Sequence, residues 1–332
     1  MERKLASIQR VNSVEPIAGA DAIVKATVLG WELVVKKGEF QPGDLCVYME
    51  VDSILPEKSE FEFLRARHFR IKTIKLRGQV SQGICFPLAM LPAGVPREEG
   101  ADITEILGIR KYIAPVPAHL GGTMKGNFPG FLRKTDEVRI QAVPDVLERQ
   151  RGKTFYVTEK LDGSSLTAYW KDGEFGVCTR NWELIETPDN GYWKAVRAAD
   201  LETRLKSLGR NLGLQGELIG NGVQSNKYRL DKLEFRLFSI FDIDKQRFFD
   251  FLDFRHMADQ LGLALVPVAW EQLTLDHAVP QLVELAKRPS LLNKEMPSEG
   301  LVFRAHVETH DPELGRLSFK ILNPEFLLKY DE

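Results

Sequence analysis

The sequence predicts an α+β protein of two domains, in which a small antiparallel barrel or sandwich precedes a larger domain of mostly antiparallel sheets with helices. The chain of 332 residues is long enough to bury two hydrophobic cores. Its first ~90 residues alternate short apolar runs with turn residues, as small barrels do. In the remainder, predicted strands outnumber helices and often follow one another directly, whereas a doubly wound sheet needs a helix between parallel strands.

Turn residues divide the first domain into short predicted strands, which include 26–28, 33–35 and 46–49. Residues 90–129 are rich in proline and glycine and weak in periodicity, so they predict a loosely packed linker. We therefore assign residues 1–120 to the barrel with its linker, and residues 121–332 to the second domain.

The stretch Phe-Arg-Ile-Lys-Thr-Ile-Lys-Leu-Arg at 69–77 alternates apolar and basic residues and changes phase at Thr73. A one-residue slip predicts a bulge or sharp bend in a barrel strand. Four of its side chains would form a basic face for a polynucleotide backbone, although a solvated strand face has the same pattern: Arg70, Lys72, Lys75 and Arg77.

In the second domain, runs of period two and period 3.6 predict a mixture of strands and helices. Strands are expected at 154–159, 165–170, 175–179, 213–219, 235–243, 263–268, 300–305 and 316–321. Helices are expected at 192–208, 250–261 and 277–287.

The composition excludes several classes of protein. Lys+Arg 45 against Asp+Glu 47 leaves a formal charge of −2, so any nucleic-acid partner must bind a local patch. The three cysteines, Cys46, Cys85 and Cys178, lack the spacing of a zinc site or a disulfide framework. The start of the chain lacks an apolar signal core, and no run approaches the ~18 apolar residues of a membrane span, so we expect a cytoplasmic protein.

One lysine is unusually placed. Residues 157–165 read Val-Thr-Glu-Lys-Leu-Asp-Gly-Ser-Ser, in which Lys160 ends an apolar run and Asp162 and Gly163 form a turn. A lysine there is often a solvated strand end. However, four later strands each carry one charge in or beside an apolar pattern, at Glu217, Asp242, Glu299 and Lys320. Because such charges are costly unless they are paired or bind a metal, they predict one shared polar cavity.

Six blocks in order resemble motifs I, Ia, III, IIIa, IV and V of the covalent nucleotidyltransferases, which include DNA ligases, RNA ligases and capping enzymes. They are Lys-Leu-Asp-Gly at 160–163, Cys-Thr-Arg-Asn at 178–181, Gln-Gly-Glu-Leu at 215–218, Phe-Asp-Ile at 241–243, Glu-Gly-Leu-Val at 299–302 and Ser-Phe-Lys at 318–320. Only ten residues follow Leu322, so an OB domain is not expected after motif V. The barrel that comes first makes the chain similar to the Deinococcus-type RNA ligases, which have an amino-terminal OB-like domain.

This resemblance implies a nucleotidyltransferase domain of ATP-grasp-like antiparallel sheets with helices, preceded by an OB-like β-barrel that engages the polynucleotide. It also implies an ATP-dependent RNA ligase that joins 3′-OH and 5′-phosphate ends, either open or in a nicked duplex, in RNA repair. A lysyl–AMP intermediate and Mg²⁺ or Mn²⁺ would be required, without a membrane or an obligate protein partner. Two alternatives are a ligase that prefers DNA and a non-catalytic nucleic-acid-binding protein.

The resemblance makes Lys160 the adenylated nucleophile, with Lys320 and Asp162 as catalytic partners. The attacking amine must be neutral, but at pH 7 only about one free lysine in a few thousand is, a handicap of roughly 4–5 kcal/mol. We expect burial, Lys320 and a divalent cation to lower the pKa of Lys160. The cation would be held by Glu299 and Glu217.

The remaining implied contacts concern the nucleotide. The backbone of Glu159 would hold the adenine edge, and Arg180 would contact ribose or phosphate. Glu217 would accept from the ribose or hold metal-bound water. Phe241 would stack on adenine opposite Val302, because strand alternation places Phe238 on the other face. Many ligases carry two lysines in motif V; here Ser318 takes the first position, and Arg316 is the candidate to replace its charge.

Overall fold

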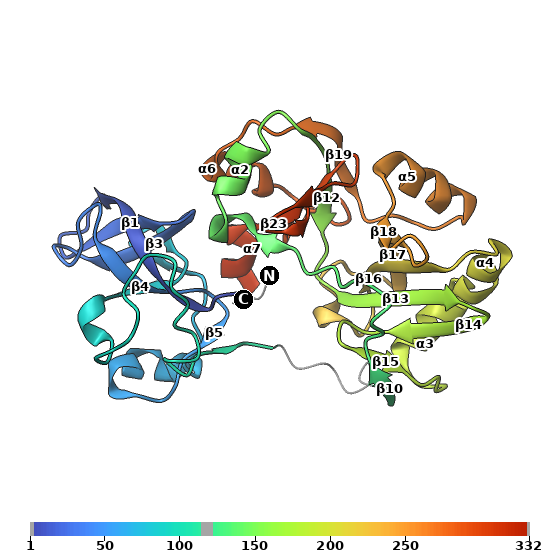
Figure 1. Cartoon of the computed structure of the whole chain (residues 1–332), viewed down its shortest axis with the longest axis horizontal. Helices are drawn as coiled ribbons and strands as arrows, with labels where there is room; N and C mark the ends of the chain where they lie inside the picture. Colours follow the sequence, from blue (N-terminus) through green and yellow to red (C-terminus); the bar gives the residue numbers. More distant parts are fainter. Residues whose placement is uncertain (1–2, 114–121, 331–332) are drawn as a thin grey trace.

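The structure, a computed structural model, describes residues 3–113 and 122–330. Figure 1 shows three sheets in a row, with the five-stranded sheet of the second domain between the barrel and the seven-stranded sheet. The predicted α+β class is confirmed. No helix in the described ranges is both long and apolar enough to cross a membrane.

The main sheet of the first domain consists of β1 (Ala6–Pro16), β2 (Ile23–Val28), β3 (Trp31–Lys36), β4 (Leu45–Met49) and β8 (Ile84–Pro87), in the order β3-β2-β1-β4-β8. The three strands predicted from the sequence lie within β2, β3 and β4. One half of β1 pairs with β2 and the other with β4, and its register slips between Val11 and Ser13. The slip lets one long strand bend around a core that includes Ile8, Trp31 and Tyr48.

Residues 69–77 do not form the single bent strand that their alternation predicted. The chain enters this stretch through His68 and Phe69, whose φ angles are 51° and 58°, in the left-handed region. Phe69 and Ile71 are buried in the core, so their burial sets the path of the chain, and Thr73 is not a bulge in a strand. The 3-10 helix η1 (Ser59–Arg67) precedes this stretch. Its end forms the strand β6 (Ile74–Leu76), which pairs with β7 (Gln79–Ser81).

The four cations of this stretch therefore do not share one face. Arg70 points inward, where its guanidinium donates to Asp52 Oδ1 at 2.8 Å. Lys75 and Arg77 are exposed on the β6–β7 hairpin, and Lys72 is half-buried. Only the hairpin pair offers its charge to a partner in solution.

Much of the predicted linker belongs to the barrel. Leu91, Ile103, Leu107 and Ile109 are buried in the core of the first domain. The same region contains η2 (Leu88–Met90) and β9 (Arg110–Lys111), and β9 pairs with β5 (Ser53–Ile54). The predicted boundary between residues 120 and 121 lies outside the described residues.

The second domain contains a seven-stranded and a five-stranded sheet. The seven-stranded sheet has the order β10 (Met124–Asn127), β15 (Trp182–Leu184), β14 (Glu174–Cys178), β13 (Ser164–Lys171), β16 (Leu212–Ile219), β17 (Glu234–Asp242) and β18 (Arg247–Phe248). The five-stranded sheet has the order β11 (Val138–Arg139), β23 (Ser318–Leu322), β20 (Gly300–Ala305), β12 (Thr154–Lys160) and β19 (Val268–Thr274). A small hairpin joins β21 (His310–Asp311) and β22 (Gly315–Arg316).

Helices cover the outer faces of these sheets. α3 (Gly191–Ala198), α4 (Leu201–Ser207) and α5 (Phe251–Gln260) contribute to the core on the seven-stranded sheet. α6 (Val279–Ala286) and the segment before β12 contribute to the core on the five-stranded sheet. The other helical elements are η3 (Ile140–Ala142), α2 (Asp145–Arg149), η4 (Gln224–Asn226) and α7 (Pro324–Tyr330).

Three predicted elements differ from the structure. The helix expected at 192–208 is two helices, because Asp200 adopts a left-handed φ of 50° between α3 and α4. Residues 263–267 of the strand predicted at 263–268 form no strand, and only Val268 belongs to one, β19. They touch β17 through a single bridge at Leu265, and Pro267, which has no N–H to donate, precedes β19. The last predicted strand, 316–321, is divided between β22 and β23.

The two domains meet at the edge strand β11. Arg139 donates to Asp52 Oδ2 at 2.6 Å, and the N–H of Gly30 donates to Gln141 O at 2.8 Å. A side chain at Gly30 would be blocked, since a Cβ there would lie 2.9 Å from Gln141 Cα. Because β11 also pairs with β23, this contact ties the barrel to the strand that carries Lys320.

Candidate active site

Lys160 is the last residue of β12, where it pairs with Gly300 of β20. Phe155 and Val157 of the same strand are buried in the core on one face of the sheet, so alternation turns Lys160 toward the opposite face. Its Nζ pairs with Glu299 Oε1; the Lys160 side chain is 27% exposed and that of Glu299 8%. The lysine is thus held by a buried carboxylate and is not a solvated strand end.

Two carboxylates beside Lys160 fit a divalent cation. Glu299 Oε2 is buried and has no hydrogen-bond partner among the described residues. Burial, reinforced by the charge of Glu299 and opposed by Lys160, raises the pKa of Glu217 to about 8. No group of three metal-binding side chains occurs in the described part of the chain. Two carboxylates suit Mg²⁺ or Mn²⁺, whose other ligands would be water and phosphate oxygens.

The pKa of Lys160 moves in the direction opposite to the prediction. Burial lowers it, but the carboxylates of Glu299 and Glu217 outweigh burial and leave the pKa above its usual value. The lowered pKa that was expected for Lys160 is found at Lys320 instead. Burial, with the nearby charges of Lys160 and Arg139, lowers the pKa of Lys320 to about 8. The protein alone therefore keeps Lys160 as an ammonium, and only a cation at the carboxylates would offset the charge that holds its proton.

Three cations from distant parts of the chain meet at Asp136. Lys320 Nζ lies 3.7 Å from its Oδ1, Lys111 Nζ lies 3.6 Å from its Oδ2, and Arg180 pairs with Oδ2. Burial raises the pKa of Asp136, but the three cations outweigh it and lower the pKa to about 2. The sequence indicated Lys320 and Arg180 but missed Lys111 and Asp136, which lie outside any strand pattern that carries a motif.

Asp162 is held by two residues of the segment between β16 and β17. Its Oδ2 accepts from Lys227 Nζ at 2.5 Å, and its backbone N–H donates to Tyr228 Oη at 2.8 Å. Neither Lys227 nor Tyr228 could be found from the sequence, since both lie in the irregular segment between β16 and β17. The catalytic role predicted for Asp162 stays a prediction, and the structure adds contacts that hold this residue in place.

The backbone N–H of Glu159 already has a hydrogen-bond partner. Its N–H donates to Pro267 O at 2.9 Å, and its side-chain Oε2 accepts from the N–H of Leu291 at 2.6 Å. The predicted adenine contact can thus use the carbonyl of Glu159 but not its N–H.

The expectation that Phe238 points away from the site is wrong. Between β16 and β17, Gln215 pairs with Ser239 but Gly216 pairs with Leu237, so Phe238 sits in a bulge that resets the alternation. The Phe238 ring lies 5.2 Å from the guanidinium of Arg304, on the strand that also carries Val302.

Phe241, the predicted adenine partner, packs elsewhere. Its ring lies edge-on to Phe248 at 4.9 Å and is almost fully buried. It lines a cavity of about 600 Å³ that also contains Asp136 and Arg316 but not Lys160.

Arg316, the candidate to replace the charge that motif V lacks at Ser318, has partners of its own. Its guanidinium donates to Glu308 at 3.1 Å and to Ser239 at 3.0 Å, and it stacks 3.8 Å from the Phe248 ring. Ser318 donates to Glu137 at 3.3 Å. The cations that share a carboxylate with Lys320 are Arg180 and Lys111, through Asp136.

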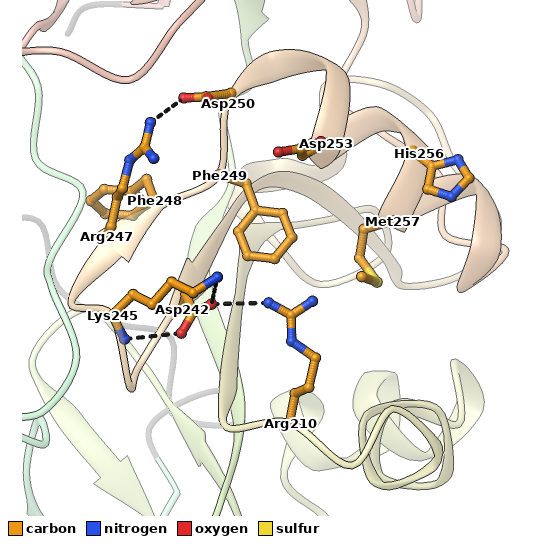
Figure 2. Close-up of a pocket in the computed structure, with 10 residues that line it drawn as sticks. All are labelled: Arg210, Asp242, Lys245, Arg247, Phe248, Phe249, Asp250, Asp253, His256 and Met257. Carbon is orange, nitrogen blue, oxygen red and sulfur yellow. Dashed lines mark hydrogen bonds and ion pairs between the residues drawn. The ribbon is translucent and has the colours of Figure 1, made fainter.

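Asp242 was expected to share the polar cavity of Lys160 but lies in another. Its carboxylate lies 2.9 Å from Arg210 and 3.5 Å from Lys245, in a cavity of about 320 Å³ against α5. Figure 2 shows both pairs. Asp242 also accepts from the backbone N–H of Lys245, which explains a charge at the end of β17 without any ligand.

Gly300 next to Glu299 offers a test of this geometry. A Cβ at Gly300 would lie 2.2 Å from Ile321 O and 2.9 Å from Leu322 Cα, so Gly300→Ala must push β20 from β23. We expect a loss of about 1–3 kcal/mol in the free energy of unfolding. Urea denaturation measures it. Gly126→Ala, at a site with no atom within 4 Å of the added carbon, is the control, and equal stability of the two variants would contradict the packing.

Comparisons with known proteins identify the family of this chain. A family model for RNA ligase matches residues 153–322, which is more than half of the chain and includes Lys160, Glu217, Glu299 and Lys320. The chain belongs to the RNA ligase family. An OB-fold domain model matches residues 5–88 of the ligase, so the predicted family and its amino-terminal OB fold are confirmed. No curated protein matches.

Solved structures match over the full length of the ligase. Naegleria gruberi RNA ligase with PPi is 40% identical and superimposes with a TM-score of 0.92, over 99% of either chain. A lysine-to-alanine mutant of that enzyme with ATP and Mn is also 40% identical, with a TM-score of 0.91 over 98% of either chain. A glutamate-to-alanine mutant with AMP and Mn gives the same values.

Proposed function

We propose that this ligase uses ATP and Mg²⁺ or Mn²⁺ to join RNA ends that carry a 3′-hydroxyl and a 5′-phosphate, in the repair of broken RNA. The observation that carries the proposal is the position of Lys160 Nζ at the buried carboxylate of Glu299, with Glu217 and Lys320 near enough to change its proton affinity. The Naegleria enzyme, solved with ATP and Mn and with AMP and Mn, supports the choice of nucleotide and metal.

In the first step, Lys160 Nζ attacks the α-phosphorus of ATP. A nitrogen–phosphorus bond forms, the bond to the pyrophosphate oxygen breaks, and the amine loses a proton. Lys320, Arg180 and Lys111 would pair with phosphate oxygens in place of Asp136. A cation held by Glu299 and Glu217 would offset charge on the triphosphate and on the departing pyrophosphate.

The later steps use the same groups. The RNA 5′-phosphate attacks the AMP phosphorus, so that the bond to Lys160 breaks and Lys160 regains a proton. The 3′-hydroxyl then attacks the activated 5′-phosphate, a phosphodiester forms, and AMP leaves. Lys320 lies close enough to Lys160 to pair with phosphate oxygens in each step.

For the adenine, we propose a sandwich between Phe238 and Val302. Phe238 takes the role predicted for Phe241, since its bulge brings it to the strand of Val302. The carbonyl of Glu159, the residue before the last of β12, would accept from the adenine amine.

We propose further that residues 1–120 engage the RNA, with residues 121–332 as the adenylyltransferase domain. The support is that Lys111 of the first domain pairs with Asp136, where Lys320 and Arg180 also meet, and that Asp52 of the first domain pairs with Arg139 of β11. Lys75 and Arg77 are the exposed cations of its β6–β7 hairpin.

Replacing Lys75 and Arg77 with alanine should lower the salt dependence of RNA binding. Each lost phosphate contact reduces the slope of log K against log salt by about 0.7–0.9. Lysine adenylation should not change, because neither residue lies near Lys160. Lys36→Ala with Lys37→Ala, exposed on the same domain, is the matched control; an equal slope for wild type and the hairpin variant would contradict the assignment.

The decisive experiment incubates the protein with radiolabelled ATP and a divalent cation, then adds nicked duplexes of RNA, DNA or both. We expect label on the denatured protein that is lost in hot acid, as a phosphoramidate should behave, and sealing of RNA nicks. Sealing of DNA in preference to RNA would contradict the substrate, and a protein that takes no label would contradict the mechanism.

A further inference from the structure

The segment 223–230, which we name the β16–β17 loop, has an unusual backbone. Four residues that are not glycine adopt left-handed φ angles: Gln224 at 43°, Ser225 at 58°, Asn226 at 47° and Arg229 at 57°. Such conformations cost stability and persist where the surrounding contacts require them. The function of this loop therefore has to be sought in what it touches.

Three side chains of the β16–β17 loop reach the turn that follows Lys160. Lys227 Nζ donates to Asp162 Oδ2 at 2.5 Å, Tyr228 Oη accepts from the N–H of Asp162 at 2.8 Å, and Gln224 Nε2 donates to Gly163 O at 3.4 Å. The β16–β17 loop thus holds both the backbone of the turn and the side chain of Asp162.

The same turn also lies against Glu217, a proposed cation ligand. A Cβ at Gly163 would lie 2.7 Å from Glu217 Cγ and 2.5 Å from Leu218 O. A displacement of the turn would therefore move Lys160 at one end and press on Glu217 at the other.

Lys227 is itself held by the last helix, α7. The side chains of Lys227 and Asp162 are only 12% and 8% exposed. Lys227 Nζ lies 5.4 Å from the centre of the Phe326 ring and 5.0 Å from that of Tyr330. A buried ammonium is costly unless it is paired, and here one carboxylate and two aromatic faces compensate it.

The start of α7 is fixed to the active site as well. Asn323, the residue before α7, donates from its backbone N–H to Glu299 O at 2.9 Å and from its side chain to Ser298 O at 3.0 Å. The helix that holds Lys227 is thus anchored to the residue that pairs with Lys160.

We propose that Lys227 is a positioning residue for lysine adenylation. Through Asp162 it fixes the turn that orients Lys160 toward the α-phosphorus of ATP, and α7 fixes Lys227 through Phe326 and Tyr330. The proposal rests on the proposed role of Lys160 as the nucleophile. Because small displacements of a nucleophile change rates strongly, the effect falls on the step in which Lys160 attacks.

The test separates that step from sealing. Lys227→Met removes the charge at similar length, and Lys227→Arg keeps the charge and the aromatic contacts. For each full-length variant, single-turnover transfer of label from ATP is measured against ATP concentration, and sealing is measured with an RNA nick that already carries a 5′-adenylate. We expect Lys227→Met to lower the maximal adenylation rate ~10–100-fold, with the half-saturating ATP concentration within ~3-fold of wild type. Sealing of the adenylated nick should stay within ~3-fold of wild type, because Lys160 is not the nucleophile there.

Lys227→Arg should retain most of the adenylation rate, and Tyr330→Leu, which removes one aromatic face at the edge of α7, should show a smaller loss in the same step. Adenylation at the wild-type rate in Lys227→Met would overturn the proposal. An equal loss of adenylation and of sealing, with a lower melting temperature, would also overturn it, since it would indicate a general structural role. Failure of wild type itself to take label, or labelling of Lys160→Ala, would instead refute the proposed function.

Discussion

Lys160→Ala should abolish the transfer of label from ATP to the protein, with a loss of at least about 10³-fold, because no other amine occupies its position at the end of β12. The fold should persist, since β12 is held by its pairing with β19 and β20. The measurement is acid-labile label on the denatured protein, with circular dichroism to confirm folding.

Lys160→Arg is the matched control for charge. A guanidinium can keep the ion pair with Glu299, but it stays protonated at neutral pH and cannot attack phosphorus. We therefore expect it to take no label either. If folded Lys160→Arg or Lys160→Ala became labelled at the wild-type rate, the nucleophile would have to be another residue.

The second large effect concerns Glu299. Glu299→Ala should depress adenylation by about 10²–10³-fold and raise the divalent-cation concentration needed for half-maximal rate, because the buried Oε2 is the proposed cation ligand. Loss of this carboxylate should also lower the pKa of Lys160, since Glu299 contributes most to raising it. That second change favours a neutral amine, so the pH at which the residual rate is half-maximal should fall.

Asp242→Asn provides a control for Glu299→Ala. Asp242 is also a buried carboxylate at the end of a strand, but it pairs with Arg210 and Lys245 in a separate cavity (Figure 2). Its loss should reduce stability without changing the dependence of adenylation on Mn²⁺. A Glu299→Ala protein with the wild-type dependence on Mn²⁺ would show that the cation binds elsewhere.

The sequence by itself determined the strands and the charges that they carry. Strand alternation has a period of two and depends on neighbouring residues alone, so a charge within an apolar strand is visible without any structure. Lys160, Glu217, Glu299 and Lys320 were found in this way, and the order of their blocks indicated the family.

The tertiary structure decided which of these charges meet and what else joins them. Asp242 has the same local pattern as Glu299 but faces another cavity, and Phe238 changes sides because of a bulge that depends on how β16 pairs with β17. Asp136 and Lys227 lie in irregular segments, and Lys111 lies in the two-residue strand β9, so no period links any of them to its neighbours. Lys227 and its partner Asp162 are 65 residues apart in the sequence. Contacts between such distant residues arise only when sheets and loops pack.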